Sequence, residues 1–348
     1  MKKHGMDATT AHSLIYTYVP PDKKVFIETE KKLEKIGAGE GDPEWGTEAE
    51  LQKLLKDCQQ PRFKLNTESE LAGAKLCGVD EVSMVNEPLA KDLLSFGVPL
   101  LVLGDPGQLP PVEGTGYLTQ GMVPNVMLDK IHRQAEGNPI IDFATRARQG
   151  KPIPFSQEKG SSARNLRLVQ CKDELEEIFC NAGQILCGKN KTRLKLNAMM
   201  RASLGRSGLY PTPEDKLICL KNNKELGLFN GLFVTMEKIH EDMGDYLIAD
   251  LKTETGIEVP RARVLTAFFN EYEAEGTVKA LNHWDRKDRV ELDFGYAITV
   301  HKSQGSQWDN VVLYDDGMFA WSSAKEARKQ WLYTAITRAA ENVTLIRT

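Results

Sequence analysis

Two short apolar runs, each ending in acidic or glycine residues, restrict the fold of this chain more than any other feature. Residues 76–79 are followed by a pair of carboxylates, and residues 98–103 by a segment rich in glycine and proline. Short runs without polar alternation are typical of strands buried on both faces of a parallel sheet. The carboxyl ends of parallel strands meet at one edge, where such sheets bind ligands. The side chains expected at this edge are Asp80, Glu81, Asp105 and Gln108.

The segment 104–111 holds Asp105 and Gln108 on an unusually rigid backbone, because it contains two glycines and three prolines. An amide can donate and accept at once, which suits the sensing of a γ-phosphate and its attacking water. Of the two carboxylates, one can hold Mg²⁺ through water and the other can polarise a water molecule. The alternative for a lone Asp-Glu pair after a strand is a solvated turn.

Composition restricts the class of protein only broadly. The 348 residues allow about two domains, and the net charge of −4 neither favours nor excludes a nucleic-acid partner. No apolar stretch reaches the ~18 residues of a membrane span, so no membrane partner is expected. The six cysteines form no C-x-x-C pair, which favours reduced core cysteines in a cytoplasmic protein.

The remaining pattern predicts an α/β fold with one all-β interruption. Strand and helix patterns alternate after residue 128, which favours a mostly parallel sheet covered on both faces. Residues 138–150 are expected to form an amphipathic helix, and residues 47–58 an exposed helix capped by Thr47 and Glu50. Short alternating strands from 216 to about 269 predict a small β-barrel inserted in the second α/β lobe.

Phosphoryl transfer also needs positive charge, and two arginines are candidates for supplying it. Arg133 lies in "LDKIHRQ", and Arg338 lies on a predicted helix that leads to a strand. A surface ion pair is the alternative for either residue. In the stretch 297–314, His301, Lys302 and Ser303 are donors suited to a nucleic-acid backbone, with a solvated loop as the alternative.

Five segments follow one another in a fixed order: "GVDEVSMV", "LVLGDPGQLPPV", "LDKIHRQAEGNPII", "AITVHKSQGSQWDNVVL" and "WLYTAITRAAENVTLI". Together they resemble motifs II to VI of superfamily 1 DNA helicases. They are most similar to the RecD/Dda-like, 5′-to-3′ branch (superfamily 1B). "TTAHSLIYT" resembles an early DNA-contacting motif of that family, and "NNKELGLFNGLFVTM" its SH3-like insertion.

The resemblance implies a role for each matching residue. Asp80 resembles the Mg²⁺-binding aspartate, Glu81 the catalytic base and Gln108 the γ-phosphate sensor. Arg133 and Arg338 resemble the two arginine fingers. Further nucleotide contacts are expected at Asp105, Gly305 and Gln307, although many relatives have Glu at the last position. The residues expected along the DNA strand are Thr10, His12, Thr299, His301, Lys302 and Ser303.

The implied architecture is two RecA-like parallel-sheet lobes, of which the first is incomplete. Residues 1–128 are expected to form the first lobe, with a 1B-like insertion near 19–70. Residues 129–205 and 285–348 would form the second lobe, and 206–284 the SH3-like insertion. ATP and Mg²⁺ would bind between the lobes. The implied partner is single-stranded DNA or a single-strand/double-strand junction, with recombination, repair or replication proteins in a bacterial or phage-infected cell; the oligomeric state is open.

A phosphate-binding loop of the form G-x-x-x-x-G-K-[ST] is missing from the 348 residues, and "CGKNKT" at 187–192 lacks the required spacing. Only eight residues precede Thr9, so we expect a helicase that lacks its N-terminal Walker A segment, through truncation, an internal start or degeneration. ATP hydrolysis is then expected to be feeble. The alternatives are a non-hydrolysing single-strand-binding or accessory protein, an RNA substrate, and a dinucleotide-dependent oxidoreductase, although no G-x-G-x-x-G follows a first strand.

Overall fold

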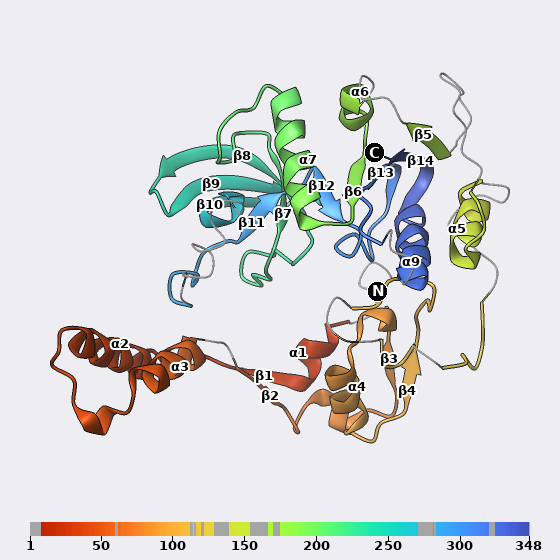
Figure 1. Cartoon of the computed structure of the whole chain (residues 1–348). Helices are drawn as coiled ribbons and strands as arrows, with labels where there is room; N and C mark the ends of the chain where they lie inside the picture. The colour runs from red at the N-terminus through yellow and green to blue at the C-terminus, as the bar shows by residue number, and fades with distance from the viewer. Residues whose placement is uncertain are drawn as a thin grey trace. The chain divides into compact units, whose positions relative to one another are not determined.

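The computed structural model describes residues 8–59, 62–111, 114, 116–119, 122–128, 139–153, 166–169, 175–270, 281, 283–319 and 324–347. The chain divides into two compact units (Figure 1). The first comprises Met1–Val79, Pro88–Val102 and Lys279–Lys287. The second comprises Asp80–Glu87, Leu103–Val278 and Asp288–Thr348.

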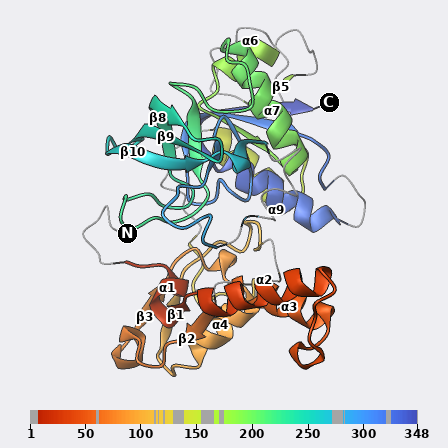
Figure 2. The same cartoon turned by 90° about the vertical axis from the view of Figure 1, so that its left-hand side faces the viewer.

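A β-ribbon with a helical hairpin at its end makes up much of the first unit. After α1 (Ala11–Ile15), β1 (Tyr16–Val19) pairs antiparallel with β2 (Arg62–Leu65). Between them the chain forms α2 (Lys23–Gly37) and α3 (Glu48–Gln59), which pack side by side (Figures 1 and 2). This hairpin lies within the stretch 19–70 where an insertion is expected, and its 1B-like character stays a prediction.

The predicted capping box of α3 is confirmed. Thr47 Oγ1 accepts from the Glu50 amide at 3.3 Å, and Glu50 Oε2 accepts from the Thr47 amide at 2.8 Å. Each side chain therefore satisfies a backbone donor that the first helical turn leaves unpaired. The hydrogen bonds that Glu50 Oε2 accepts from the amide and the hydroxyl of Thr47 lower the pKa of Glu50.

The two predicted apolar strands form a parallel pair, but the prediction that they are buried on both faces is wrong, since Leu101 is 50% and Val102 39% exposed. β3 (Cys77–Val79) lies beside β4 (Leu100–Val102), with Cys77 opposite Leu100 and Val79 opposite Val102. Helix α4 (Glu87–Leu94) belongs to the segment between them, as a parallel connection requires.

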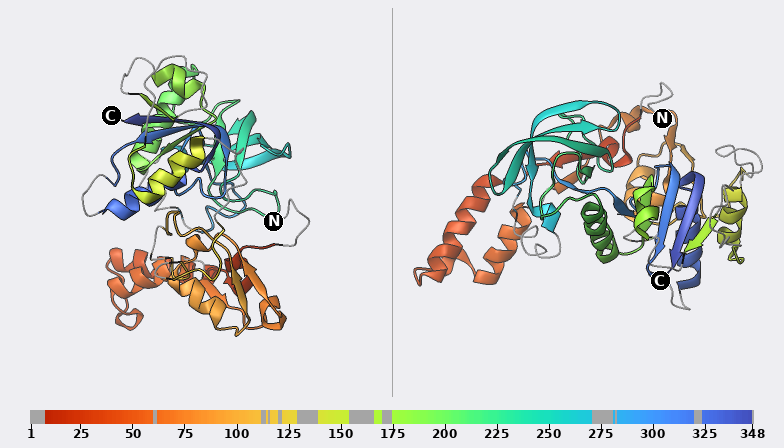
Figure 3. Two further views of the ribbon diagram at one scale, coloured as in Figure 1. Left: turned by 90° about the vertical axis from the view of Figure 1, so that its right-hand side faces the viewer. Right: turned by 90° about the horizontal axis from the view of Figure 1, so that it is seen from above.

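The second unit contains a five-stranded parallel sheet in the order β12-β6-β13-β14-β5. The bounds of its strands are Ala297–Thr299, Gln184–Cys187, Trp308–Asp315, Ala339–Arg347 and Leu166–Val169, in that order. Helices α5 (Pro139–Gln149) and α9 (Lys325–Ile336) cover one face, and α6 (Leu175–Cys180) and α7 (Asn190–Ser203) the other (Figure 3). The predicted mostly parallel α/β fold is confirmed.

A second sheet lies between β6 and β12 in the chain, in the order β10-β9-β8-β7-β11. Its antiparallel strands are Glu258–Leu265, Tyr246–Thr253, Phe233–Asp242, Lys216–Cys219 and Leu292–Phe294, in that order. The all-β interruption is therefore present, and an isolated bridge joins Val264 to Val290. The SH3-like character of this sheet stays a prediction.

Candidate functional site

The segments that follow β3 and β4 lie side by side, as the sequence predicts. The amide of Val82 donates to the carbonyl of Leu103 at 3.0 Å. A Cβ at Gly104 would lie 2.6 Å from Val82 Cγ1, so this approach requires glycine. Residues Asp80-Glu81 and the loop that begins at Gly104 thus leave the sheet at one edge.

The two carboxylates at this edge differ in their surroundings. Asp80 is exposed, and its Oδ1 accepts from the amide of Glu81 at 2.9 Å. Glu81 is half-buried and has φ of 52°, in the left-handed region. Non-glycine residues seldom adopt this conformation, and such strain concentrates at functional sites.

The loop carrying Asp105 and Gln108 is hydrogen-bonded to helix α9. The hydroxyl of Tyr333 donates to Asp105 Oδ2, and the amide of Leu109 donates to Thr334 Oγ1 at 2.9 Å. Within the loop, Asp105 Oδ1 accepts from the amide of Gly107 at 2.8 Å. The rigidity expected from the glycines and prolines is thus reinforced by contacts with residues more than 220 positions away.

The loop after β12 joins the same network. Gln304 Nε2 donates to the carbonyl of Leu109 at 3.0 Å. The buried guanidinium of Arg338 donates to the carbonyls of Ser306 at 3.2 Å and Thr334 at 3.1 Å. Gly305 has φ of 81° with open space around it, whereas Gln307 is exposed. The 105–109 loop, the 304–307 loop and α9 therefore form one hydrogen-bonded network.

Four buried polar atoms, three in this network and one in the neighbouring segment 82–84, have no hydrogen-bond partner among the described residues. They are Ser83 Oγ, Gln108 Oε1, Gln304 Oε1 and Trp331 Nε1. The remaining such atom of the described part, His240 Nε2, lies 2.8 Å from Asp250 Oδ2. Because buried polar atoms are nearly always paired, each of these unsatisfied atoms needs a ligand or water as its partner.

Two basic side chains beside this loop were not predicted from the sequence. A hollow of about 170 Å³ is lined by Gly107, Arg148 on α5 and Lys329 on α9, among others. A Cβ at Gly107 would lie 3.2 Å from Arg148 Nε. The amphipathic pattern of 138–150 predicted a helix but did not indicate which of its polar residues would face the loop.

The residues predicted to contact single-stranded DNA lie in both units. In the first, Thr10 Oγ1 accepts from the Ser13 amide at 3.2 Å and thereby caps α1. The His12 ring packs against Tyr16 and Phe63, with centroids 4.6 and 4.4 Å away. This cluster offers aromatic surface of the kind on which bases stack.

In the second unit, the residues predicted to contact DNA surround the end of β12. Lys302 is half-buried, its amide bonds Thr299 Oγ1 at 3.4 Å, and its ammonium contacts Asn230 Oδ1. Burial lowers the pKa of both His301 and Lys302. Ser303 is fully buried and its hydroxyl donates to the Val300 carbonyl at 2.8 Å, so this group stabilises the loop.

Arg133 lies outside the described residues. Within the described part, no cluster of three or more His, Cys, Asp or Glu residues suits a metal, and no helix has the length and apolar character of a membrane span. A single carboxylate such as Asp80 still fits Mg²⁺, which protein sites commonly hold through one or two carboxylates together with substrate phosphates.

Two family models match the chain. Residues 294–346 match the UvrD-like helicase C-terminal domain, and residues 1–166 match an AAA domain. The chain is 28% identical to the ATP-dependent RecD2 DNA helicase of Deinococcus radiodurans over 285 residues, which cover 75% of this chain and 34% of that protein. It is 24% identical to a probable conjugal transfer protein TraA of Sinorhizobium fredii, over 76% of this chain and 24% of that protein.

Solved structures agree on the fold. Bacteroides Pif1 bound to ssDNA is similar with a TM-score of 0.50 and 15% identity, over 79% of this chain and 71% of that one. The fold and the matched models define the class as a helicase with RecA-like parallel sheets. Within that class the matched models and the RecD2 relative identify the chain as a RecD-like superfamily 1B helicase. It spans about a third or less of the length of these two curated relatives.

Proposed function

We propose that this protein is an ATP-dependent DNA helicase or translocase of the RecD type that acts on single-stranded DNA. The observation that carries the proposal is the hydrogen-bonded network of the 105–109 loop, the 304–307 loop and α9, together with its unsatisfied buried polar atoms. A nucleotide at this edge would give Gln108 Oε1 a polar partner. Bound Mg²⁺ would neutralise phosphate charge there.

Within this proposal the residues of the edge have distinct tasks. Asp80 would hold Mg²⁺, Glu81 would accept a proton from water, and Gln108 would orient that water. Arg338 and Arg133 would stabilise charge on the phosphate oxygens, with Asp105, Gly305 and Gln307 close to the nucleotide. For Arg338 this requires its guanidinium to exchange the carbonyls of Ser306 and Thr334 for phosphate.

A motor must link the state of its nucleotide to its affinity for the DNA strand. Gln304 supports such a link, because it bonds the nucleotide-side loop at Leu109 and lies two positions after Lys302 on the proposed strand side. Thr299, His301 and Lys302, with Thr10 and His12 of the first unit, would contact a single strand or the single-stranded arm of a junction.

The polypeptide 1–348 is proposed to be deficient in ATP hydrolysis. A phosphate loop and its lysine supply much of the binding of β- and γ-phosphates, and these residues contain no G-x-x-x-x-G-K-[ST]. This same observation favours the second candidate function, a non-hydrolysing single-strand-binding or accessory protein that keeps the helicase fold.

Strand binding and hydrolysis can be tested separately on purified residues 1–348. Fluorescence anisotropy with a labelled 15-nucleotide dT strand is expected to show binding that weakens with salt. Lys302→Ala should weaken binding about tenfold, while Lys252→Ala, an exposed lysine on β9, should not. Absence of strand binding would contradict the proposed function.

ATP turnover and the effect of ATP·Mg²⁺ on strand affinity separate the two candidates. A shift in strand affinity with ATP·Mg²⁺ supports the helicase, and its absence supports the accessory protein. Turnover at ordinary helicase rates would contradict the proposed deficiency.

A further inference from the structure

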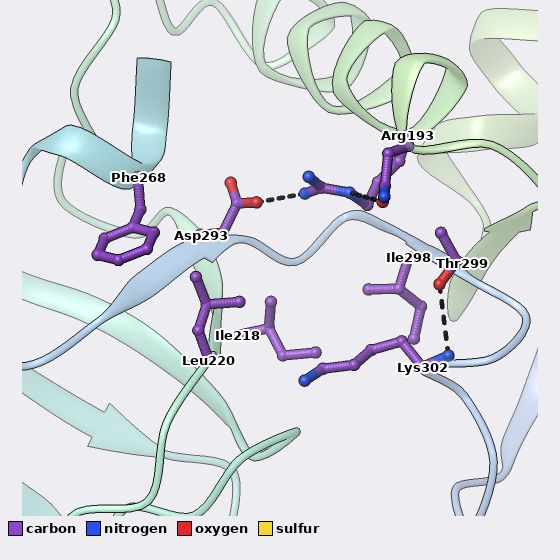
Figure 4. A pocket seen from close by; sticks show the side chains of 9 residues that line it. Arg193, Ile218, Leu220, Phe268, Asp293, Ile298, Thr299 and Lys302 are labelled. Carbon is purple, nitrogen blue, oxygen red and sulfur yellow. Dashed lines mark hydrogen bonds and ion pairs between the residues drawn. The ribbon is translucent and has the colours of Figure 1, made fainter. Parts of the chain in front are cut away.

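A cavity of about 210 Å³ opens beside Lys302 in the second unit (Figure 4). It lies where α7, the end of β12 and the antiparallel sheet meet. Three aliphatic side chains, Ile218, Leu220 and Ile298, line it together with the ring of Phe268. Its walls are therefore largely apolar, although charged side chains stand around them.

The charged side chains lie on two sides of this cavity. On one side, Arg193 of α7 forms an ion pair with Asp293 of β11. On the opposite side, Lys302 extends along the cavity below Ile218 (Figure 4). Because Asp293 already pairs with Arg193, Lys302 leaves the surroundings positive, and the nearby Arg193 adds to burial in lowering the pKa of Lys302. An anionic group is therefore favoured at this mouth.

We propose that this cavity receives one base of the bound single strand, turned out of the stack, while the adjoining phosphate lies against Lys302 and Thr299. The inference rests on the proposed function and adds to it a subsite that holds one base. Size supports it, because about 210 Å³ is below the ~300–1,000 Å³ usual for a drug-sized ligand and suits one ring system.

The chemistry of the walls also fits a base. Every base has a flat π-face, so an aromatic ring and aliphatic side chains bind bases with little regard to sequence. Phe268 is 9% exposed and belongs to the short 3-10 helix Ala267–Asn270, which sets its ring against the cavity. The expected ligand is therefore a pyrimidine or purine ring of a strand.

The chain offers a matched control in the next residue. Phe269 is 6% exposed and equal in size, but its ring lies 5.1 Å from that of Phe294 and lines a separate cavity of about 390 Å³. Loss of either ring removes a similar amount of buried surface. Only loss of Phe268 removes a wall of the proposed base site.

The first experiment measures binding of a labelled dT 12-mer by anisotropy. Phe268→Ala removes the ring and Leu220→Trp fills the cavity, and each should weaken binding about 5- to 50-fold, in line with the loss of one stacked base. Phe269→Ala should stay within about twofold of the parent. Circular dichroism and thermal unfolding check that each variant folds.

The second experiment needs no variant. A single 2-aminopurine is moved along the dT 12-mer, and its emission is expected to change sharply at one position when the protein binds. An abasic site at that position should weaken binding to the parent protein but weaken it no further in Phe268→Ala.

The outcomes separate this inference from the proposed function. If Phe268→Ala and Leu220→Trp bind like the parent while Lys302→Ala weakens binding, the base site is wrong and the strand site stands. Equal losses in Phe268→Ala and Phe269→Ala, or uniform 2-aminopurine emission at every position, also overturn the base site. Absence of oligonucleotide binding by the parent overturns both.

Discussion

The phenol of Tyr333 donates a hydrogen bond to Oδ2 of Asp105, across 228 positions of sequence. Burial and the negative charge of Asp105 both raise the pKa of Tyr333, so its hydroxyl stays protonated as the donor. One residue further along α9, Thr334 Oγ1 accepts from the amide of Leu109. The loop that bears Gln108 is thus held at both ends by one helix.

Removal of the second of these contacts should destabilise the protein. Thr334→Val leaves the fully buried Leu109 amide without an acceptor, which costs about 1–3 kcal/mol of unfolding free energy. Tyr333→Phe removes a donor but leaves Asp105 bonded to Gly107, so its effect should be smaller, about 1 kcal/mol. Urea unfolding followed by tryptophan fluorescence measures both changes.

Thr145→Val is the control for this pair. Thr145 is exposed on α5 and its hydroxyl donates only to the Ile141 carbonyl of its own helix. Its unfolding midpoint should stay close to that of the parent. A Thr334→Val protein as stable as Thr145→Val would show that the loop is not fastened in this way.

Gln108→Met should raise the stability of the protein while removing its link to nucleotide. The substitution replaces a buried oxygen that has no partner with an apolar side chain of similar shape, for an expected gain of about 1 kcal/mol in unfolding free energy. In the proposed helicase, any change of strand affinity with ATP·Mg²⁺ should disappear. Urea unfolding and strand anisotropy give the two results.

Gln304→Met tests whether the gain is specific to Gln108. Its Oε1 also lacks a partner, but its Nε2 donates to the Leu109 carbonyl, so loss of that bond should offset the gain. A lower stability for Gln108→Met than for the parent would mean that the amide contributes to folding.

The sequence predicted the edge of the sheet because backbone geometry decides it. The parallel strands β3 and β4 end side by side, so the sequence alone predicts that Asp80 and Gly104 lie at the same edge of the sheet. The capping box at Thr47 was equally predictable, since it depends on residues three positions apart. Helix 138–150 followed from its apolar spacing, and the structure has it at Pro139–Gln149.

Long-range side-chain contacts could not be predicted in this way. Nothing in the local pattern around Tyr333 or Thr334 indicates a partner near residue 105, because the contact depends on how α9 packs. Burial of Ser303 was missed for the same reason, since its spacing matches a strand-contacting donor. Helix α2 was not predicted, although Phe26, Leu33 and Ile36 have the spacing of one apolar helix face.

Loss of the cap on α3 should loosen the helical hairpin locally. Thr47→Ala removes both the acceptor for the Glu50 amide and a donor to Glu50 Oε2, which should cost about 1 kcal/mol. Because the hairpin extends from a two-stranded ribbon, we expect faster hydrogen exchange in α3 and little change in α9. Thr67→Ala, at an exposed position after β2, serves as the control. Unchanged exchange in α3 would contradict a stabilising role for the cap.

The stability of the second unit should depend on pH through Lys216. Its ammonium donates to Gln184 Oε1 at 2.9 Å and to the Gly183 carbonyl at 3.2 Å, and burial lowers its pKa from 10.5 to about 8. Below pH 8 the lysine is protonated in both the folded and unfolded states, and the folded state carries the full penalty of the buried charge. Between pH 8 and 10.5 the unfolded state binds more protons, so unfolding free energy rises with pH.

The effect is measured as the difference between the parent and Lys216→Met, because buried tyrosines and cysteines titrate in the same range with the opposite sign. The unfolding free energy of the parent minus that of Lys216→Met should increase by up to about 3 kcal/mol from pH 8 to 10.5. Lys252→Met, on an exposed lysine of β9, should give a curve parallel to the parent. Parallel curves for Lys216→Met as well would mean that Lys216 keeps an ordinary pKa in the folded protein, and that water reaches its ammonium between β7 and β6.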